Sequence, residues 1–244
     1  MTHKIYSIKE NIQVIILDVS ENMEQYITDN IVKICDGCAE TDLPVIRLRL
    51  YDYLEPKSPQ QRHGAIAEFY IHLFLNLQGY KQEFLFLNLE ENSIKKGFDG
   101  YYTYNGEQWI VESKSGENAT HRGKIAEAYN DLEKKISTKS KNNPWQNAYN
   151  HAAHYAVQAE HKIIQRLKAL ADNYAKDIHF PLTEFNLIPC GTIFDYNASD
   201  DTIKDEIYKQ IIDLPDNMTA KKLCLIAISN RAYSSFLQYI GLDV

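Results

Sequence analysis

The sequence predicts an α/β fold in which helices flank a mixed central β-sheet. Three observations support this prediction. Short apolar runs of strand length alternate with longer runs of helical hydrophobic spacing. Asn105-Gly106 separates two alternating runs, which is the strongest short signal for a β-hairpin. Towards the C-terminal end, a helical pattern over Asp200–Ile212 lies between two apolar strand-like runs, Asn186–Phe194 and Leu223–Ser229.

The first part of the chain is expected to hold mixed structure. An apolar run, a helical spacing and an alternating run predict a strand, a helix and a half-buried strand, over Asn11–Asp18, Met23–Cys35 and Val45–Tyr53 respectively. Two prolines between residues 55 and 59 then interrupt the pattern. We therefore predict an N-terminal α+β extension over residues 1–58 that packs on a main domain over residues 59–244.

The main domain is expected to begin with a helix over Gln60–Gln78, which Gly79 would end. This helix is apolar nearly all round, so we expect it to be buried. The next segments are predicted as three strands and two helices, in chain order Gln82–Leu89, Gly97–Tyr104, Glu107–Ser113, His121–Ile136 and Trp145–Leu170. The order from residue 60 is thus helix, three strands, helices, strand, helix and strand.

The predicted hairpin carries three charged residues close together. If Asn105 and Gly106 are its loop residues, counting outward places Asp99 directly opposite Glu112. Side chains opposite each other on an antiparallel pair share a face, so these two carboxylates would repel each other. Lys114 lies two residues beyond Glu112 and is therefore expected on the same face.

Two acids and one amine on one face suit metal-dependent phosphodiester hydrolysis. Mg²⁺ takes oxygen ligands and is commonly held by one or two carboxylates, which would offset the repulsion between Asp99 and Glu112. The ammonium of Lys114 would then activate an attacking water or stabilise the charge that grows on the scissile phosphate. The competing interpretation is an exposed hairpin in which Lys114 forms an ordinary ion pair with either acid.

These residues resemble the PD-(D/E)XK nuclease superfamily. Asp99 lies in the segment Gly97–Gly100, and Glu112 and Lys114 end the strand that follows. Phe98 stands where the superfamily usually has Pro. Over roughly residues 60–230, the resemblance implies a restriction-endonuclease-like core of a helix, a three-strand meander, a helix and a further strand. It also implies that Asp99 and Glu112 bind Mg²⁺ or Mn²⁺ and that Lys114 is catalytic.

The first helix contributes one more candidate. The superfamily often takes a further metal-binding acid from this helix, and Glu68 is the only acid between Arg62 and Gln78. An isolated carboxylate in an apolar helix is costly unless it is paired or bound to a metal. Glu68 is therefore a predicted metal ligand, and the alternative is a salt bridge to Arg62 or Lys114.

A fuller pattern is similar to the HamA-like nuclease subunit of bacterial Hachiman anti-phage defence. It consists of three segments, Arg62–Glu68, Lys96–Gly100 and Glu112–Gly116. The resemblance implies cleavage of DNA together with a superfamily-two helicase encoded nearby. The formal net charge of the chain is −7, so its composition does not indicate a basic DNA-binding face. A helicase partner that supplies the DNA track would account for this acidity.

Two weaker patterns stay open. His121, Arg122 and Lys124 begin the helix expected after the active strand, where a helix N-terminus attracts phosphate, but they are also explained as ordinary polar residues. Cys35 and Cys38 form a lone CxxC without two further ligands at the spacing of a zinc site, so we expect reduced thiols.

No stretch of the sequence approaches the length of a membrane span, and the first residues lack the apolar core of a signal peptide. We expect a cytoplasmic protein without a membrane partner. The principal hypothesis is a metal-dependent DNA endonuclease of anti-phage defence. The competing hypotheses are a catalytically inactive nuclease-fold module that binds a helicase or DNA, and a zinc-stabilised interaction protein.

Overall fold

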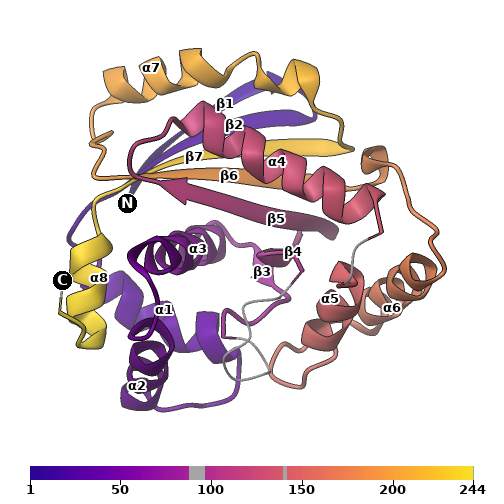
Figure 1. The fold of residues 1–244 in the computed structure, drawn as a ribbon, viewed down its shortest axis with the longest axis horizontal. Coiled ribbons are helices and arrows are strands. Elements are labelled where there is room, and N and C mark those ends of the chain that lie inside the picture. The colour runs from indigo at the N-terminus through magenta and orange to yellow at the C-terminus, as the bar shows by residue number, and fades with distance from the viewer. Residues whose placement is uncertain (88–96, 140–141, 244) are drawn as a thin grey trace.

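A computed structural model describes residues 1–87, 97–139 and 142–243 of the chain. It consists of a central mixed β-sheet with helices on both faces (Figure 1). The predicted α/β class with a mixed central sheet is confirmed.

The strands are β1 (Thr2–Lys9), β2 (Ile12–Val19), β3 (Lys81–Gln82), β4 (Gly100–Tyr104), β5 (Glu107–Gly116), β6 (Asn186–Phe194) and β7 (Lys222–Asn230). The α-helices are α1 (Glu24–Asp36), α2 (Leu43–Leu54), α3 (Pro59–Leu77), α4 (His121–Ser137), α5 (Pro144–Ala152), α6 (His161–Ala175), α7 (Asp201–Ile211) and α8 (Tyr233–Ile240). Two short 3₁₀ helices, η1 (Leu182–Glu184) and η2 (Leu214–Asn217), precede β6 and β7.

The strands of the described residues form one sheet in the spatial order β1-β2-β7-β6-β5-β4-β3. The four central strands are parallel, and β1, β4 and β3 pair antiparallel at the two edges. All nine residues of β6 are buried, as expected for a parallel strand covered on both faces. Trp109 and Val111 of β5 pack with α1, α2, α3 and α8, whereas Ile110 packs with α4 to α7. Strand β5 therefore lies between α3 on one face and α4 on the other.

Helix α3 begins and ends as the sequence indicates. Ser58 and Gln61 form a reciprocal capping box, and Pro59 occupies the first helical position, where a missing N–H costs nothing. Gly79 follows the helix with a φ of 84°, which favours glycine. The helix is buried along most of its length, as predicted, and it forms one wall of the site described below.

The strand predicted over Val45–Tyr53 is wrong, because this segment lies in helix α2. Its residues alternate in hydrophobicity, but Ile46, Leu50 and Leu54 also recur every four residues and all three are buried. The alternate apolar residues Val45 and Leu48 are exposed. This segment is a helix because the side chains of Ile46, Leu50 and Leu54 pack on one face against the core. The alternation of apolar and polar residues, which suggested a strand, was coincidental.

The single helix predicted over Trp145–Leu170 is also wrong, because it is divided into α5 and α6. The connecting residues 153–160 use their backbone groups for tertiary contacts. The carbonyl of Ala156 accepts the N–H of Cys38 at 3.0 Å, and the carbonyl of Gln158 accepts the ammonium of Lys81 at 2.8 Å. Gln158 has a φ of 52°, which interrupts a helix.

The strand predicted over Gln82–Leu89 is shorter than expected. Only Lys81–Gln82 pairs as β3, Phe84–Leu87 are buried without being assigned to a strand, and the last two positions lie outside the described residues. Strand β1 was not predicted. It is an edge strand with many exposed polar residues, so its sequence lacks the apolar run that marks a buried strand.

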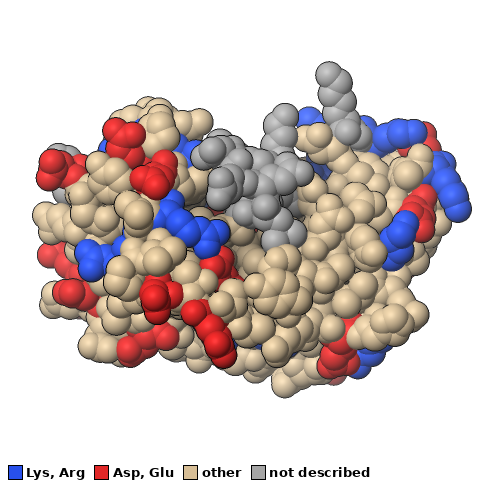
Figure 2. Space-filling model, turned by 90° about the horizontal axis from the view of Figure 1, so that it is seen from below, with Lys and Arg blue, Asp and Glu red and all other residues tan. Residues whose placement is uncertain are grey.

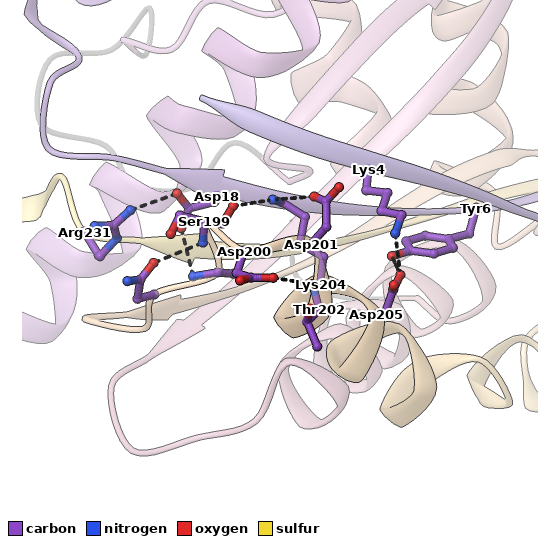
Figure 3. A network of polar contacts seen from close by, with 12 residues as sticks. Lys4, Tyr6, Asp18, Ser199, Asp200, Asp201, Thr202, Lys204, Asp205 and Arg231 are labelled. Carbon is purple, nitrogen blue, oxygen red and sulfur yellow. Dashed lines mark hydrogen bonds and ion pairs between the residues drawn. The ribbon is translucent and has the colours of Figure 1, made fainter.

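The N-terminal part of the chain is joined to the rest through the sheet. Strand β2 pairs with β7 along its whole length. Asp205 of α7 accepts a hydrogen bond from Lys4 of β1 at 2.7 Å, and Asp18 of β2 pairs with Arg231 at 3.0 Å (Figure 3). Residues before 58 thus supply two strands of the common sheet, while the domain boundary at that point remains a prediction.

Candidate active site

The predicted hairpin forms at the expected residues. Asn105 and Gly106 have φ values of 49° and 76°, so both central residues of the turn have the positive φ that a type I′ turn requires. Strands β4 and β5 pair in the predicted register, from Tyr104 opposite Glu107 to Gly100 opposite Val111.

The register changes at Asp99. Its backbone N–H donates to the carbonyl of Val111 at 3.1 Å, although Val111 is already the partner of Gly100. Two residues thus face one, which is the arrangement of a β-bulge, and a bulge redirects the side chain that it carries. The prediction that Asp99 lies directly opposite Glu112 is wrong for this reason.

The Asp99 carboxylate lines a cavity of about 340 Å³ between α3 and the end of β5. Its Oδ2 atom accepts hydrogen bonds from the backbone N–H and the hydroxyl of Ser113, at 2.7 and 2.9 Å. Glu68 of α3 and Lys114 of β5 line the same cavity. The other lining residues are Tyr53, Lys57, Gln61, Gly64, Ala65 and Ser115. Three of the predicted site residues therefore meet at one cavity.

Glu112 lies on the opposite face of β5, towards α4. It is 1% exposed, and its two carboxylate oxygens lie 3.2 Å from the ammonium of Lys114 and 2.6 Å from that of Lys135 in α4. Lys114 also contacts Asp131 of α4 at 2.5 Å. Glu112 is thus held in a cluster of ion pairs between β5 and α4, next to the cavity but not among its lining residues.

Burial and the repulsion between neighbouring carboxylates raise the pKa values of Asp99 and Glu112. Burial, reinforced by the negative charge of Asp99, raises the pKa of Glu112 to about 8 in spite of the two lysines. Burial and the nearby Glu68 carboxylate likewise raise the pKa of Asp99. Burial by itself would lower the pKa of Lys114, but the surrounding carboxylates, led by Glu112, outweigh it and raise that pKa. Lys114 therefore remains an ammonium at neutral pH.

A buried pair lies behind Glu68. Nε2 of His72, one turn further along α3, lies 3.5 Å from a Glu68 oxygen, and Nδ1 contacts the hydroxyl of Tyr102 in β4. The His72 and Tyr102 side chains are almost fully buried. Gly100 leaves the space for this pair, since a Cβ there would lie 2.8 Å from the Tyr102 ring. Strand β4 thereby places the His72–Tyr102 pair next to the Glu68 carboxylate.

The cavity offers oxygen ligands of the kind that a hard divalent cation prefers. Mg²⁺ is commonly held by one or two carboxylates together with water and phosphate oxygens, and Glu68 and Asp99 could supply the two. Across residues 1–87, 97–139 and 142–243, no group of three or more His, Cys, Asp or Glu side chains is placed to hold a metal ion. The arrangement therefore fits a two-carboxylate site, with Glu112 engaged by ammonium groups beside it.

The structure does not bring the predicted phosphate-contacting residues to this cavity. His121 is 4% exposed, its ring contacts a carbonyl of β7, and burial lowers its pKa to about 4. It is a neutral interior side chain. Arg122 pairs with Asp213 at 2.5 Å, and Lys124 pairs with Glu127 at 2.8 Å.

The CxxC pair lies at the end of α1. Cys35 is buried and Cys38 is exposed, and in the described residues neither forms a disulfide. In the described part of the chain, neither belongs to a cluster of potential metal ligands.

Sequence reasoning missed the residues that α4 and the α2–α3 segment bring to the site. Asp131 and Lys135 are spaced four apart on the helix that follows β5, so both face the strand. That spacing was a usable signal. Lys57 had no comparable signal, because α2 was predicted as a strand. Gly64 lies in the predicted first helix and in the segment Arg62–Glu68, but its local sequence does not indicate that it lines a cavity.

A sequence model of the HamA family matches residues 2–238. Neither a curated protein sequence nor a solved structure gives a significant match to the chain. Among the described residues, no helix has the length and apolar character needed to cross a membrane.

Proposed function

The chain belongs to the HamA family, which implies a part in Hachiman anti-phage defence, and on this premise we propose that it is a metal-dependent DNA endonuclease. In this proposal it hydrolyses phosphodiester bonds together with a helicase partner. The proposal includes a PD-(D/E)XK core. It is supported by the order α3, β3, β4, β5, α4 and β6, a helix, three strands, a helix and a strand.

The observation that carries the proposal is the meeting of Glu68, Asp99 and Lys114 at one cavity. They come from α3, from the bulge before β4 and from β5, which are far apart in sequence. The Glu68 and Asp99 carboxylates repel each other, and burial increases that repulsion. A divalent cation bound between them would offset it and could also bind a phosphate oxygen.

Each side chain has a defined task in this proposal. Glu68 and Asp99 hold Mg²⁺ or Mn²⁺, with Ser113 fixing the Asp99 carboxylate. When bound, such a cation supplies Lewis-acid polarisation of the phosphate. Lys114 stays protonated, so it stabilises the negative charge of the transition state and does not act as a general base. Asp131 holds the Lys114 ammonium in place.

Glu112 is the third proposed metal ligand. Both of its oxygens are engaged by lysines, so it becomes available to a cation only when Lys135 or Lys114 withdraws. A divalent cation would replace one ammonium as the counter-charge of this buried carboxylate. Lys135 is therefore proposed to neutralise Glu112 while no metal is present.

The test is cleavage of plasmid and single-stranded DNA by the purified chain with Mg²⁺ or Mn²⁺. We expect cleavage by the wild type and a loss of about 100-fold or more in two variants. Lys114→Met removes the ammonium proposed to stabilise the transition state, and Glu112→Gln removes a proposed metal ligand. Lys209→Gln in α7, an exposed lysine, is the control for a change of net charge. Circular dichroism checks that each variant is folded.

Two outcomes would reject the proposal. Metal-dependent cleavage that persists in both site variants would show that the nuclease centre lies elsewhere. No cleavage by the wild type, either alone or with its helicase partner and ATP, and no heat of Mn²⁺ binding, would favour the inactive binding module.

A further inference from the structure

The wall of the cavity that faces β5 contains a cation without an anionic partner. Lys57 lies between α2 and α3, and its ammonium is 4.0 Å from the centre of the Tyr53 ring. It is half-buried, and burial lowers its pKa. In the described part of the chain this ammonium makes no ion pair or hydrogen bond, whereas Lys114 and Lys135 each contact carboxylates.

The same wall contains a glycine that the packing of the protein does not explain. Gly64 lies inside helix α3 with an ordinary helical φ, and a Cβ there would meet no atom within 4 Å. Glycine inside a helix is about 1 kcal/mol less favourable than alanine. Gly97 and Gly191 differ, since a Cβ at these positions would lie 2.6 and 2.9 Å from neighbouring backbone. Gly64 therefore costs stability and leaves empty space in the cavity.

We propose that Lys57 and Gly64 form a phosphate-binding subsite for a polynucleotide strand, in which Lys57 holds a phosphate adjacent to the scissile one and Gly64 admits the sugar–phosphate backbone. This inference rests on the proposed nuclease function. An unpaired ammonium calls for an anion, and a surface without side-chain atoms allows a close approach of the ligand backbone. Tyr53 keeps the ammonium over the cavity by a cation–π contact.

The charge of the rest of the molecule makes one such contact important. The chain has a net charge of −7. On the face shown in Figure 2, the basic side chains of the described residues are mixed with acidic ones and form no continuous basic surface. A DNA strand is then held by a few local contacts near the site, so the loss of one contact should lower the affinity for DNA measurably.

The first test measures the affinity of the full chain for a fluorescein-labelled single-stranded DNA of about 20 nucleotides. Ca²⁺ replaces Mg²⁺, because it takes the same oxygen ligands, and a denaturing gel checks that the strand stays intact. We expect Lys57→Gln to raise Kd about tenfold at about 50 mM NaCl. The slope of log K against log salt should fall by about 0.7, the value for one phosphate of a single strand. Lys209→Gln is the matched control, since it removes the same charge from an exposed position on the other face of the sheet.

An unchanged salt slope in Lys57→Gln would overturn the subsite. So would an equal loss in Lys209→Gln, because the effect would then reflect net charge alone.

The second test is a size series at Gly64. Gly64→Ala should raise the melting temperature by about 3 °C, because alanine favours the helix and its methyl group meets open space. The same variant should weaken binding about threefold, and Gly64→Leu about 30-fold, as the side chain fills the subsite. A higher melting temperature with unchanged affinity in both variants would show that no ligand uses this space. A lower melting temperature in Gly64→Ala would contradict the premise that the space is open.

Failure of this inference differs from failure of the proposed function. If the wild type cleaves DNA and the Lys57 and Gly64 variants bind DNA as tightly as the wild type, the subsite is rejected and the proposed nuclease function is retained. Absence of DNA binding and of cleavage by the wild type, both alone and with its helicase partner and ATP, would reject the subsite and the nuclease function together.

Discussion

The two faces of strand β5 carry different electrostatic arrangements. On the α3 side, the Glu68 and Asp99 carboxylates line an open cavity. On the α4 side, Glu112 is 1% exposed and closed in by Lys114 and Lys135. The difference arises from one β-bulge, which turns Asp99 away from Glu112. The comparison shows that the two charged residues of an acid-x-Lys strand can have different surroundings. Lys114 lines the open cavity, whereas Glu112 lies in a closed cluster whose negative charge keeps Lys114 protonated.

The largest expected effect comes from the open side. Asp99→Asn should lower DNA cleavage by about 100-fold or more, because one of the two cavity-lining carboxylates proposed to bind the metal is lost. The same change should raise the free energy of unfolding in chelator, since it removes a partly buried charge repelled by Glu68. Cleavage rates and urea unfolding measure the two effects. If Asp99→Asn loses stability and activity together, the carboxylate is structural and the contrast between the faces is mistaken.

The next effect concerns the α4 side of β5, where Glu112 should make the stability of the fold depend on pH. The pKa of Glu112 is about 8 in the folded chain, against 4.5 in the unfolded chain. Between these values the folded state binds the extra proton, so stability should fall as pH rises from about 5 to 8 and level off above. We expect the difference in unfolding free energy between wild type and Glu112→Gln to change by on the order of 2–4 kcal/mol over this range. Urea unfolding in chelator at several pH values measures it, and a difference independent of pH would mean that Glu112 is already ionised at pH 5.

The smallest expected effect concerns the support of Glu68. Tyr102→Phe keeps the ring in the core but removes the hydroxyl that contacts His72. As a positioning pair, His72 and Tyr102 should act through the metal, so the Mn²⁺ concentration for half-maximal cleavage should rise about tenfold. The KM for DNA should stay unchanged. Equal changes in both quantities, or a loss explained by unfolding alone, would show that the pair is only structural.

Local patterns predicted most of the secondary structure. The Asn105-Gly106 turn, helix α3 with its capping box, and strands β6 and β7 all follow from residues close together in sequence. The failures share one cause. In α2 and in the break between α5 and α6, long-range packing and backbone contacts outweighed an ambiguous local period.

The sequence by itself determined the hairpin and the short triplet that ends at Lys114, because a two-residue turn fixes which residues pair. It also carried the segments that resemble the nuclease family, and the family match agrees with them. Only the tertiary structure decided where the charges go. The bulge at Asp99, the Lys135 partner of Glu112 and the wall with Lys57 and Gly64 all depend on segments brought together from distant parts of the chain. Burial and charge act over distances in space, and no local pattern encodes which distant side chain will neutralise a buried acid.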